Sequence, residues 1–145
     1  MIARILVATG LLLLSGCASG SSTCPGEACE PDTQARFDAI AALDGVVEVD
    51  EVQRADSPDR GPRRSAKVTT DLPEKPAVLR LGVDVIRELQ DWEGVEPSDA
   101  QVILRWQDEI VIVDQQGELI CELVDRVQRD CRPEDSWRLD GTPAG

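Results

Sequence analysis

The chain of 145 residues contains no histidine and no tyrosine. Histidine is the side chain that most often serves as a general base, so a serine or cysteine nucleophile in this chain has no obvious partner. A mixed cysteine–histidine zinc site also lacks its histidine ligands. The sequence has neither a glycine-rich phosphate loop nor a calcium loop of the D-x-[DN]-x-[DN]-G form. These absences predict a protein without a cofactor or a metal ion and disfavour most catalytic classes.

Basic residues are scarce as well. The chain has 15 lysines and arginines against 28 aspartates and glutamates, which gives a formal net charge of −13. A surface of this charge repels nucleic acids and anionic lipid head groups. Nucleic acid is therefore not expected as a partner.

Long hydrophobic runs are absent except near the N-terminus, where an apolar run extends from Ile5 to Leu14. A helix needs about 20 apolar residues to span a bilayer, so this run is too short to be a membrane anchor. Arg4 precedes the run and small residues follow it, as in the hydrophobic region of a secretory signal. Residues 1–16 are therefore predicted to be a signal peptide.

The run ends in Leu14-Ser15-Gly16-Cys17, which resembles the lipobox of bacterial lipoprotein precursors. The resemblance implies that the thiol of Cys17 receives a diacylglycerol, that the signal is cut before Cys17, and that the new amino group is acylated. Several acyl chains hold a protein stably on a bilayer. The expected location is the outer face of the cell membrane, or the outer membrane where the source has one. The alternative is an ordinary secretory signal with an incidental cysteine.

The processed chain, residues 17–145, is long enough for one domain with its own core. Removal of residues 1–16 takes away one arginine and no acid, so 14 basic and 28 acidic residues remain and the formal charge is −14. Residues 17–31 are rich in Ser, Gly and Pro and are predicted to be the acylated N-terminus and a flexible tether. A folded domain is expected over residues 32–132, followed by a polar C-terminal tail over residues 133–145.

Four cysteines remain beside the lipidation site, and an even number in an exported chain indicates disulfides. They are Cys24, Cys29, Cys121 and Cys131, which allow three pairings. We expect Cys24 to pair with Cys29, across a Pro-Gly turn, and Cys121 with Cys131. In one continuous helix Cys121 and Cys131 would lie ~15 Å apart, beyond the roughly 7 Å that a disulfide allows between Cα atoms. Residues 118–130 fit either a helix or a strand that turns back, and the strand is favoured.

Two helices are expected from the spacing of apolar residues. In the first, Asp32 is a candidate N-cap, Phe37 and Ile40 lie on the apolar face, and Gly45 ends the helix. The second begins near Pro73–Pro76, ends at Gly94 and carries the stripe Val78, Leu81, Val85, Ile86, Leu89 and Trp92.

Four strands complete the pattern. The segment VVEVDEVQR predicts a strand with Val47 and Val49 on one face, and AKVTTD predicts the next. AQVILRW and EIVIVD predict a hairpin that turns at Gln107 and Asp108. The resulting order is αββαββ, an α+β two-layer sandwich with two helices on one face of a mainly antiparallel sheet and a fifth strand from residue 118.

This order is similar to that of BON-type αβ modules of bacterial envelope proteins. The resemblance depends on the element order and on Gly-Val pairs at Gly45 and Gly94, over residues 32–114. No functional residue is carried over from it.

Three arginines, Arg60, Arg63 and Arg64, fall in a Pro- and Gly-rich segment between the first two strands, which is predicted to be a loop. Loops often carry function, and guanidinium groups bind carboxylates and phosphates. The segment is a candidate contact for an acidic envelope protein or an anionic wall polymer. The alternative is a solvated loop tip.

Acidic neighbours such as Glu48 with Asp50 and Asp91 with Glu93 are expected on solvated faces, and Trp137 is expected to be the exposed tryptophan. The sequence thus favours a membrane-anchored, non-catalytic binding or structural module of the cell envelope. The alternative function is an envelope hydrolase that uses paired carboxylates.

Overall fold

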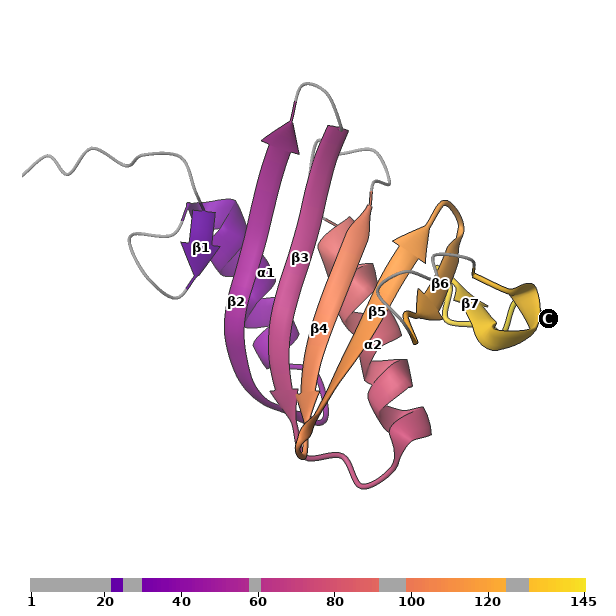
Figure 1. Ribbon diagram of the computed structural model, residues 1–145. Coiled ribbons are helices and arrows are strands. Elements are labelled where there is room, and N and C mark those ends of the chain that lie inside the picture. Colours follow the sequence, from indigo (N-terminus) through magenta and orange to yellow (C-terminus); the bar gives the residue numbers. More distant parts are fainter. Residues whose placement is uncertain (1–21, 25–29, 58–60, 92–98, 125–130) are drawn as a thin grey trace, which may run out of the picture.

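The computed structural model describes residues 22–24, 30–57, 61–91, 99–124 and 131–145 (Figure 1). These residues form one sheet of seven strands, and the order of the strands in the sheet is their order in the chain. The elements are β1 (Ser22–Cys24), α1 (Pro31–Ala41), β2 (Val46–Ser57), β3 (Gly61–Thr70), α2 (Lys75–Gln90), β4 (Ala100–Trp106), β5 (Glu109–Gln116), β6 (Leu119–Glu122), the 3₁₀ turn η1 (Pro133–Asp135) and β7 (Ser136–Arg138).

Neighbouring strands are antiparallel except for β3 and β4, which are parallel. The exception arises because α2 connects them. Its 16 residues rise about 24 Å, which returns the chain to the end of the sheet where β3 began. Both helices lie on the same face of the sheet (Figure 1). The α+β class and the mostly antiparallel sheet are confirmed. The strand β6 corresponds to the predicted fifth strand, whereas β1, η1 and β7 were not predicted.

The core lies between α2 and the sheet. The predicted stripe on α2 is buried at Val78, Leu81, Val85, Ile86 and Leu89, whereas Trp92 and Gly94 lie outside the described residues. The helix begins at Lys75 with Pro76 in its first turn, where proline needs no backbone donor.

α2 lies close to the sheet at Gly82. A Cβ atom at this position would lie 2.6 Å from Cγ2 of Val113 on β5 and 3.2 Å from Cδ1 of Leu104 on β4. Glycine at this position therefore allows the helix to lie directly against the sheet.

The predicted alternation in β2 is wrong, because the strand contains two β-bulges. Val49 is 5% exposed, but Val47 is 59% exposed. The register with β3 shifts between Val46 and Glu48 and again between Val49 and Glu51. Each bulge adds one residue to β2, so the residues that face the core, Val46, Val49 and Val52, are three apart instead of two.

The boundaries of α1 also differ from the prediction. The helix begins at Pro31 after Glu30, and Asp32 lies inside its first turn. Proline in the first turn has its φ angle set for a helix, and the N-cap is Glu30, two residues before the predicted Asp32. The helix ends at Ala41, and Ala42 is its C-cap. Gly45, the predicted stop, has a φ of +89° and forms the turn into β2, with the Leu72 side chain packed against it.

The predicted hairpin is confirmed, with Gln107 and Asp108 between β4 and β5. A second two-residue turn at Gly117, whose φ is +63°, leads into β6, so the favoured strand is confirmed for residues 119–122. Residues 125–130 lie outside the described residues.

The C-terminal segment is part of the sheet instead of a separate polar tail. β7 pairs with β6, and Trp137, which lies opposite Ile120, is half-buried against the core. Its predicted exposure is therefore wrong, because pairing of β7 with the sheet edge covers one side of the indole. Cys121 and Cys131 form a disulfide with their Cα atoms 5.6 Å apart, as expected.

The segment predicted to be a flexible tether contains β1, which pairs with residues 52–54 of β2. Thr23 and Cys24 lie in this strand, and its backbone hydrogen bonds to β2 supply a local structure that composition alone does not reveal. The signal peptide, Cys17 and Cys29 lie outside the described residues, so lipidation and the Cys24–Cys29 pairing stay predictions.

Candidate binding groove on the open sheet face

The helices cover one face of the sheet (Figure 1), and the other face is here called the open face. The strand register arranges the side chains of this face in rows across the strands. Residues directly opposite each other on neighbouring strands project to the same face. The register places Glu51, Lys67, Ile103 and Ile112 in one row, and Gln53, Ser65, Gln101 and Asp114 in the next.

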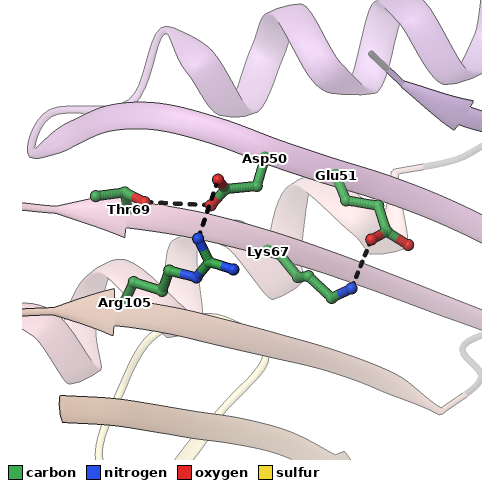
Figure 2. A network of polar contacts seen from close by, with 5 residues as sticks. All are labelled: Asp50, Glu51, Lys67, Thr69 and Arg105. Atoms are coloured by element: carbon green, nitrogen blue, oxygen red, sulfur yellow. Dashed lines mark hydrogen bonds and ion pairs between the residues drawn. The ribbon is translucent and has the colours of Figure 1, made fainter. Parts of the chain in front are cut away.

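Charged residues on β2, β3 and β4 neutralise one another on the open face, as Figure 2 shows. Lys67 Nζ donates to Glu51 Oε2 at 2.6 Å. Asp50 accepts a hydrogen bond from Thr69 Oγ1 at 3.2 Å and forms an ion pair with Arg105 at 3.6 Å. The two basic side chains of this network therefore already have anionic partners within the domain.

Beside this network lies a groove of about 600 Å³ over β3, β4 and β5. Ile103, Ile112 and Leu123 form its apolar floor, and polar residues form its walls. We call it the sheet groove; its polar lining is Arg63, Asp99, Gln101, Asp114, Gln115 and Gln116. An adjoining hollow of about 290 Å³ shares Arg63, Asp99, Gln101 and Asp114 with the groove; its other lining residues are Gln53, Ala55, Arg64 and Ser65.

The floor is apolar because β4 and β5 carry aliphatic side chains on both faces. Val102 and Leu104 are fully buried under the helices, while Ile103 between them is half-buried on the open face. Ile112 lies opposite Ile103. Strands with apolar residues on both faces are typical of sheets that are covered on both sides. Among the described residues, helices cover only one side.

The structure separates the three arginines that the sequence placed in one loop. Arg60 lies outside the described residues, and Arg63 and Arg64 belong to β3, which begins at Gly61. Alternation along the strand then sends their side chains to opposite faces. Arg63 is exposed and lines the sheet groove, whereas Arg64 is 2% exposed and its Nη1 donates to the Arg63 carbonyl at 2.9 Å.

The predicted loop is therefore wrong for Arg63 and Arg64, which lie in a strand, and Arg64 is almost fully buried; the contact with a partner stays a prediction. Pairing of β3 with β4 explains the difference: the Arg64 N–H donates to the Asp99 carbonyl at 3.1 Å, and the parallel ladder begins at this residue. A segment rich in Pro and Gly thus forms a strand through hydrogen bonds to a distant part of the chain.

The acidic pairs named from the sequence do not form a shared site within the described residues. Glu48 is exposed, Asp50 is held by Arg105, and Asp91 is exposed at the end of α2, with Glu93 outside the described part. Two other carboxylates, Asp99 and Asp114, line the same groove. They lie just before β4 and near the end of β5, and only the hairpin register could have indicated that they share one end of the sheet.

A second hollow, of about 670 Å³, lies beside the disulfide, between Leu79 of α2 and Trp137 of β7. On its border Lys75 Nζ lies 2.8 Å from Glu122 Oε1, and this hydrogen bond raises the pKa of Lys75. Hydrogen bonds from the Thr142 hydroxyl and backbone N–H lower the pKa of Asp140. The first contact connects α2 to β6, and the contacts of Asp140 lie within the C-terminal segment.

Within the described ranges, no group of three or more His, Cys, Asp or Glu side chains could hold a metal ion. Neither helix of the described part is long and apolar enough to cross a membrane. Comparison with family models, with curated proteins and with solved structures finds no match to this chain.

Proposed function

We propose that this chain is an exported lipoprotein whose domain is a non-catalytic binding or structural module of the cell envelope. The observation that carries the proposal is the sheet groove. Its three aliphatic residues offer apolar contact area and its polar residues offer hydrogen-bonding groups, which are the two kinds of contact that binding sites combine. The groove lies on the face opposite the helices, where a partner can approach it.

The finer description of the fold belongs to this proposal. The αββαββ unit from Pro31 to Gln116 acts as a two-layer support, with the helices packed on one side and the partner bound on the other. The similarity in element order to BON-type envelope modules supports this arrangement.

Lipidation at Cys17 is the anchor of the proposed module, and the lipobox-like sequence supports it. The variant Cys17→Ser should incorporate no labelled fatty acid and should accumulate as an unprocessed precursor. Cys131→Ser is a matched control, because it loses a cysteine of the domain and should still be labelled. Labelling of the Cys17→Ser chain would contradict the anchor.

The binding role is tested by site-specific photo-crosslinking of the full chain in cells. A photoreactive side chain at Gln101 in the sheet groove should give crosslinked products with an envelope component. The same side chain at Arg80, an exposed position on α2, should give far fewer. Equal products at both positions, or none at Gln101, would contradict a binding role of the groove.

A second function, an envelope hydrolase that uses paired carboxylates, is favoured by one observation: Asp99 and Asp114 line the same groove. A carboxylate pair can supply the acid and the base of a hydrolysis. The test is whether the wild-type chain releases soluble fragments from isolated envelopes. Release by the wild type that is abolished in both Asp99→Asn and Asp114→Asn would establish the hydrolase. It would also overturn the non-catalytic proposal.

A further inference from the structure

We propose that β1 fastens the lipidated N-terminus to the sheet, so that the edge formed by β1 and β2 is the side of the domain that faces the bilayer. The inference rests on the proposed function, because it takes the lipid on Cys17 as the anchor. It adds the surface that lies at the membrane and the height at which the sheet groove opens. Two features support it: the short chain before β1, and the difference between the two edges of the sheet.

The chain between the lipid and the sheet is short. β1 begins at Ser22, five residues after Cys17. Five residues span at most about 18 Å, even when they are fully extended. Without β1, the first fixed element would be α1 at Pro31, fourteen residues after Cys17, and the chain before it would span up to about 50 Å. Pairing of β1 with β2 therefore shortens the reach of the anchor about threefold.

The pairing also decides which part of the domain lies near the anchor. Ser22 lies opposite Arg54, and Thr23 lies opposite Gln53. β1 is one edge strand of the sheet, and β7 is the other, six strands away (Figure 1). Strands lie about 4.8 Å apart, so the two edges are separated by about 29 Å along the sheet. The anchor therefore holds the β1–β2 edge near the head groups and leaves the β7 edge free to lie further away.

The two edges of the sheet differ in their cover. The outer side of β7 is paired with the C-terminal residues: the Arg138 N–H donates to the Thr142 carbonyl at 2.8 Å. In the same way the Ala144 N–H donates to the Ser136 carbonyl at 3.0 Å. At the opposite edge β1 covers only residues 52–54 of β2, and no other described strand pairs with the outer side of either. An open edge is prone to pair with another chain, and a bilayer close to this edge restricts the approach of such a chain.

The same register limits the height of the sheet groove above the bilayer. One row across β1, β2, β3 and β4 consists of Thr23, Gln53, Ser65 and Gln101. Gln101 lines the groove, and three strand spacings, about 14 Å, separate it from Thr23. Together with the chain before β1, this places the Cα atom of Gln101 within about 35 Å of that of Cys17. A partner of the groove must therefore come within about that distance of the membrane surface.

The test measures how far two positions of the full lipoprotein lie from the bilayer. The protein is placed in nanodiscs of zwitterionic lipid that carries an acceptor dye on its head groups. A fluorescent amino acid replaces either Ala55, exposed on β2 beside Arg54, or Glu134, exposed in η1 next to β7. Energy transfer to the lipid should be at least twofold more efficient from position 55 than from position 134. Equal transfer, or stronger transfer from position 134, would overturn the inference.

The variant Ser22→Pro/Thr23→Pro tests the role of β1 directly. Consecutive residues of an antiparallel strand point their N–H groups to opposite sides, so one of the two prolines removes a donor to β2. Transfer from position 55 should then fall at least twofold, because the anchor can reach further. Gly20→Pro/Ser21→Pro is the matched control, which also adds two prolines but leaves the N–H groups of β1 in place, and it should not change the transfer. An unchanged signal in Ser22→Pro/Thr23→Pro would show that β1 does not hold the anchor and would overturn the inference.

Fatty-acid labelling of the same samples separates this inference from the proposed function. A chain without fatty acid on Cys17 would overturn the proposed anchor, and the inference with it. A labelled chain with the wrong order of transfer would overturn the inference alone and leave the anchored module intact. A dimer of the labelled chain in detergent that Ser22→Pro/Thr23→Pro dissociates, measured by analytical ultracentrifugation, would assign the open edge to a second copy and also overturn the inference.

Discussion

The carboxylate of Asp50 on β2 reaches across β3 to Arg105 on β4, with 3.6 Å between Oδ1 and Nη1. Asp50 is the extra residue of the second β-bulge, between Val49 and Glu51. In a regular strand two consecutive residues project to opposite faces. The bulge instead places both Asp50 and Glu51 on the open face, where each finds a basic partner (Figure 2). A local irregularity of β2 therefore creates the charged border of the sheet groove.

This ion pair should contribute little to stability. Arg105 has 60% of its side chain exposed, and exposed pairs typically contribute about 0.2–1 kcal/mol. A double-mutant cycle with Asp50→Ala and Arg105→Ala, followed by urea unfolding, should give a coupling energy in that range that falls in high salt. Asp50→Ala alone should cost more than Arg105→Ala, because Asp50 also accepts the hydrogen bond from Thr69. A larger loss for Arg105→Ala would contradict this assignment.

Adjacent arginines of β3 should respond in opposite ways to substitution. Arg64 is 2% exposed and donates a hydrogen bond inside the domain, so Arg64→Ala should reduce the free energy of unfolding by about 1–3 kcal/mol. Arg63 is exposed on the open face, and Arg63→Ala should leave the melting temperature nearly unchanged. Thermal unfolding followed by circular dichroism measures both, and similar effects of the two substitutions would show that the faces are assigned wrongly.

The variant Gly82→Ala should destabilise the domain although alanine favours helices. A new Cβ would lie 2.6 Å from Val113 Cγ2, so either the helix or the strand must move. Overpacking of a core costs about 1–3 kcal/mol, which equals or exceeds the ~1 kcal/mol that alanine gains over glycine within a helix. Chemical denaturation should show this loss, and the double variant Gly82→Ala/Val113→Ala should lose less than the sum of its single changes. Strict additivity would mean that the two residues do not touch.

Loss of the Cys121–Cys131 disulfide should loosen the C-terminal segment. The bond closes a loop with a sequence separation of 10, for which the chain-entropy model gives about 2–3 kcal/mol. Cys121→Ala/Cys131→Ala should lose about that amount, and fluorescence of Trp137, now half-buried on β7, should shift towards that of a solvated indole. Peptide mapping without reductant should recover the 121–131 bond. A disulfide-linked peptide that joins Cys121 or Cys131 to Cys24 would contradict the structure.

Features set by local patterns could be predicted from the sequence. The stripe from Val78 to Leu89 has the period of a helix with one buried face, and the runs around Gln107 and Asp108 have the length and turn of a hairpin. The spacing of Cys121 and Cys131 required a chain that turns back, and β6 does so. In each case the residues that decide the structure are close together in the chain, so their period or spacing can be read directly.

Only the tertiary structure decided the features that depend on pairing between distant segments. The bulges that expose Val47 and bury Val49 arise from the register of β2 with β3, and the register of β3 with β4 turns Arg63 outward and Arg64 inward. The sheet groove combines Asp99, Ile112 and Leu123 with Arg63 of β3, which lies more than 30 positions earlier in the chain. No local period encodes such a register, because a shift of one residue exchanges the two faces of a strand and leaves its composition unchanged.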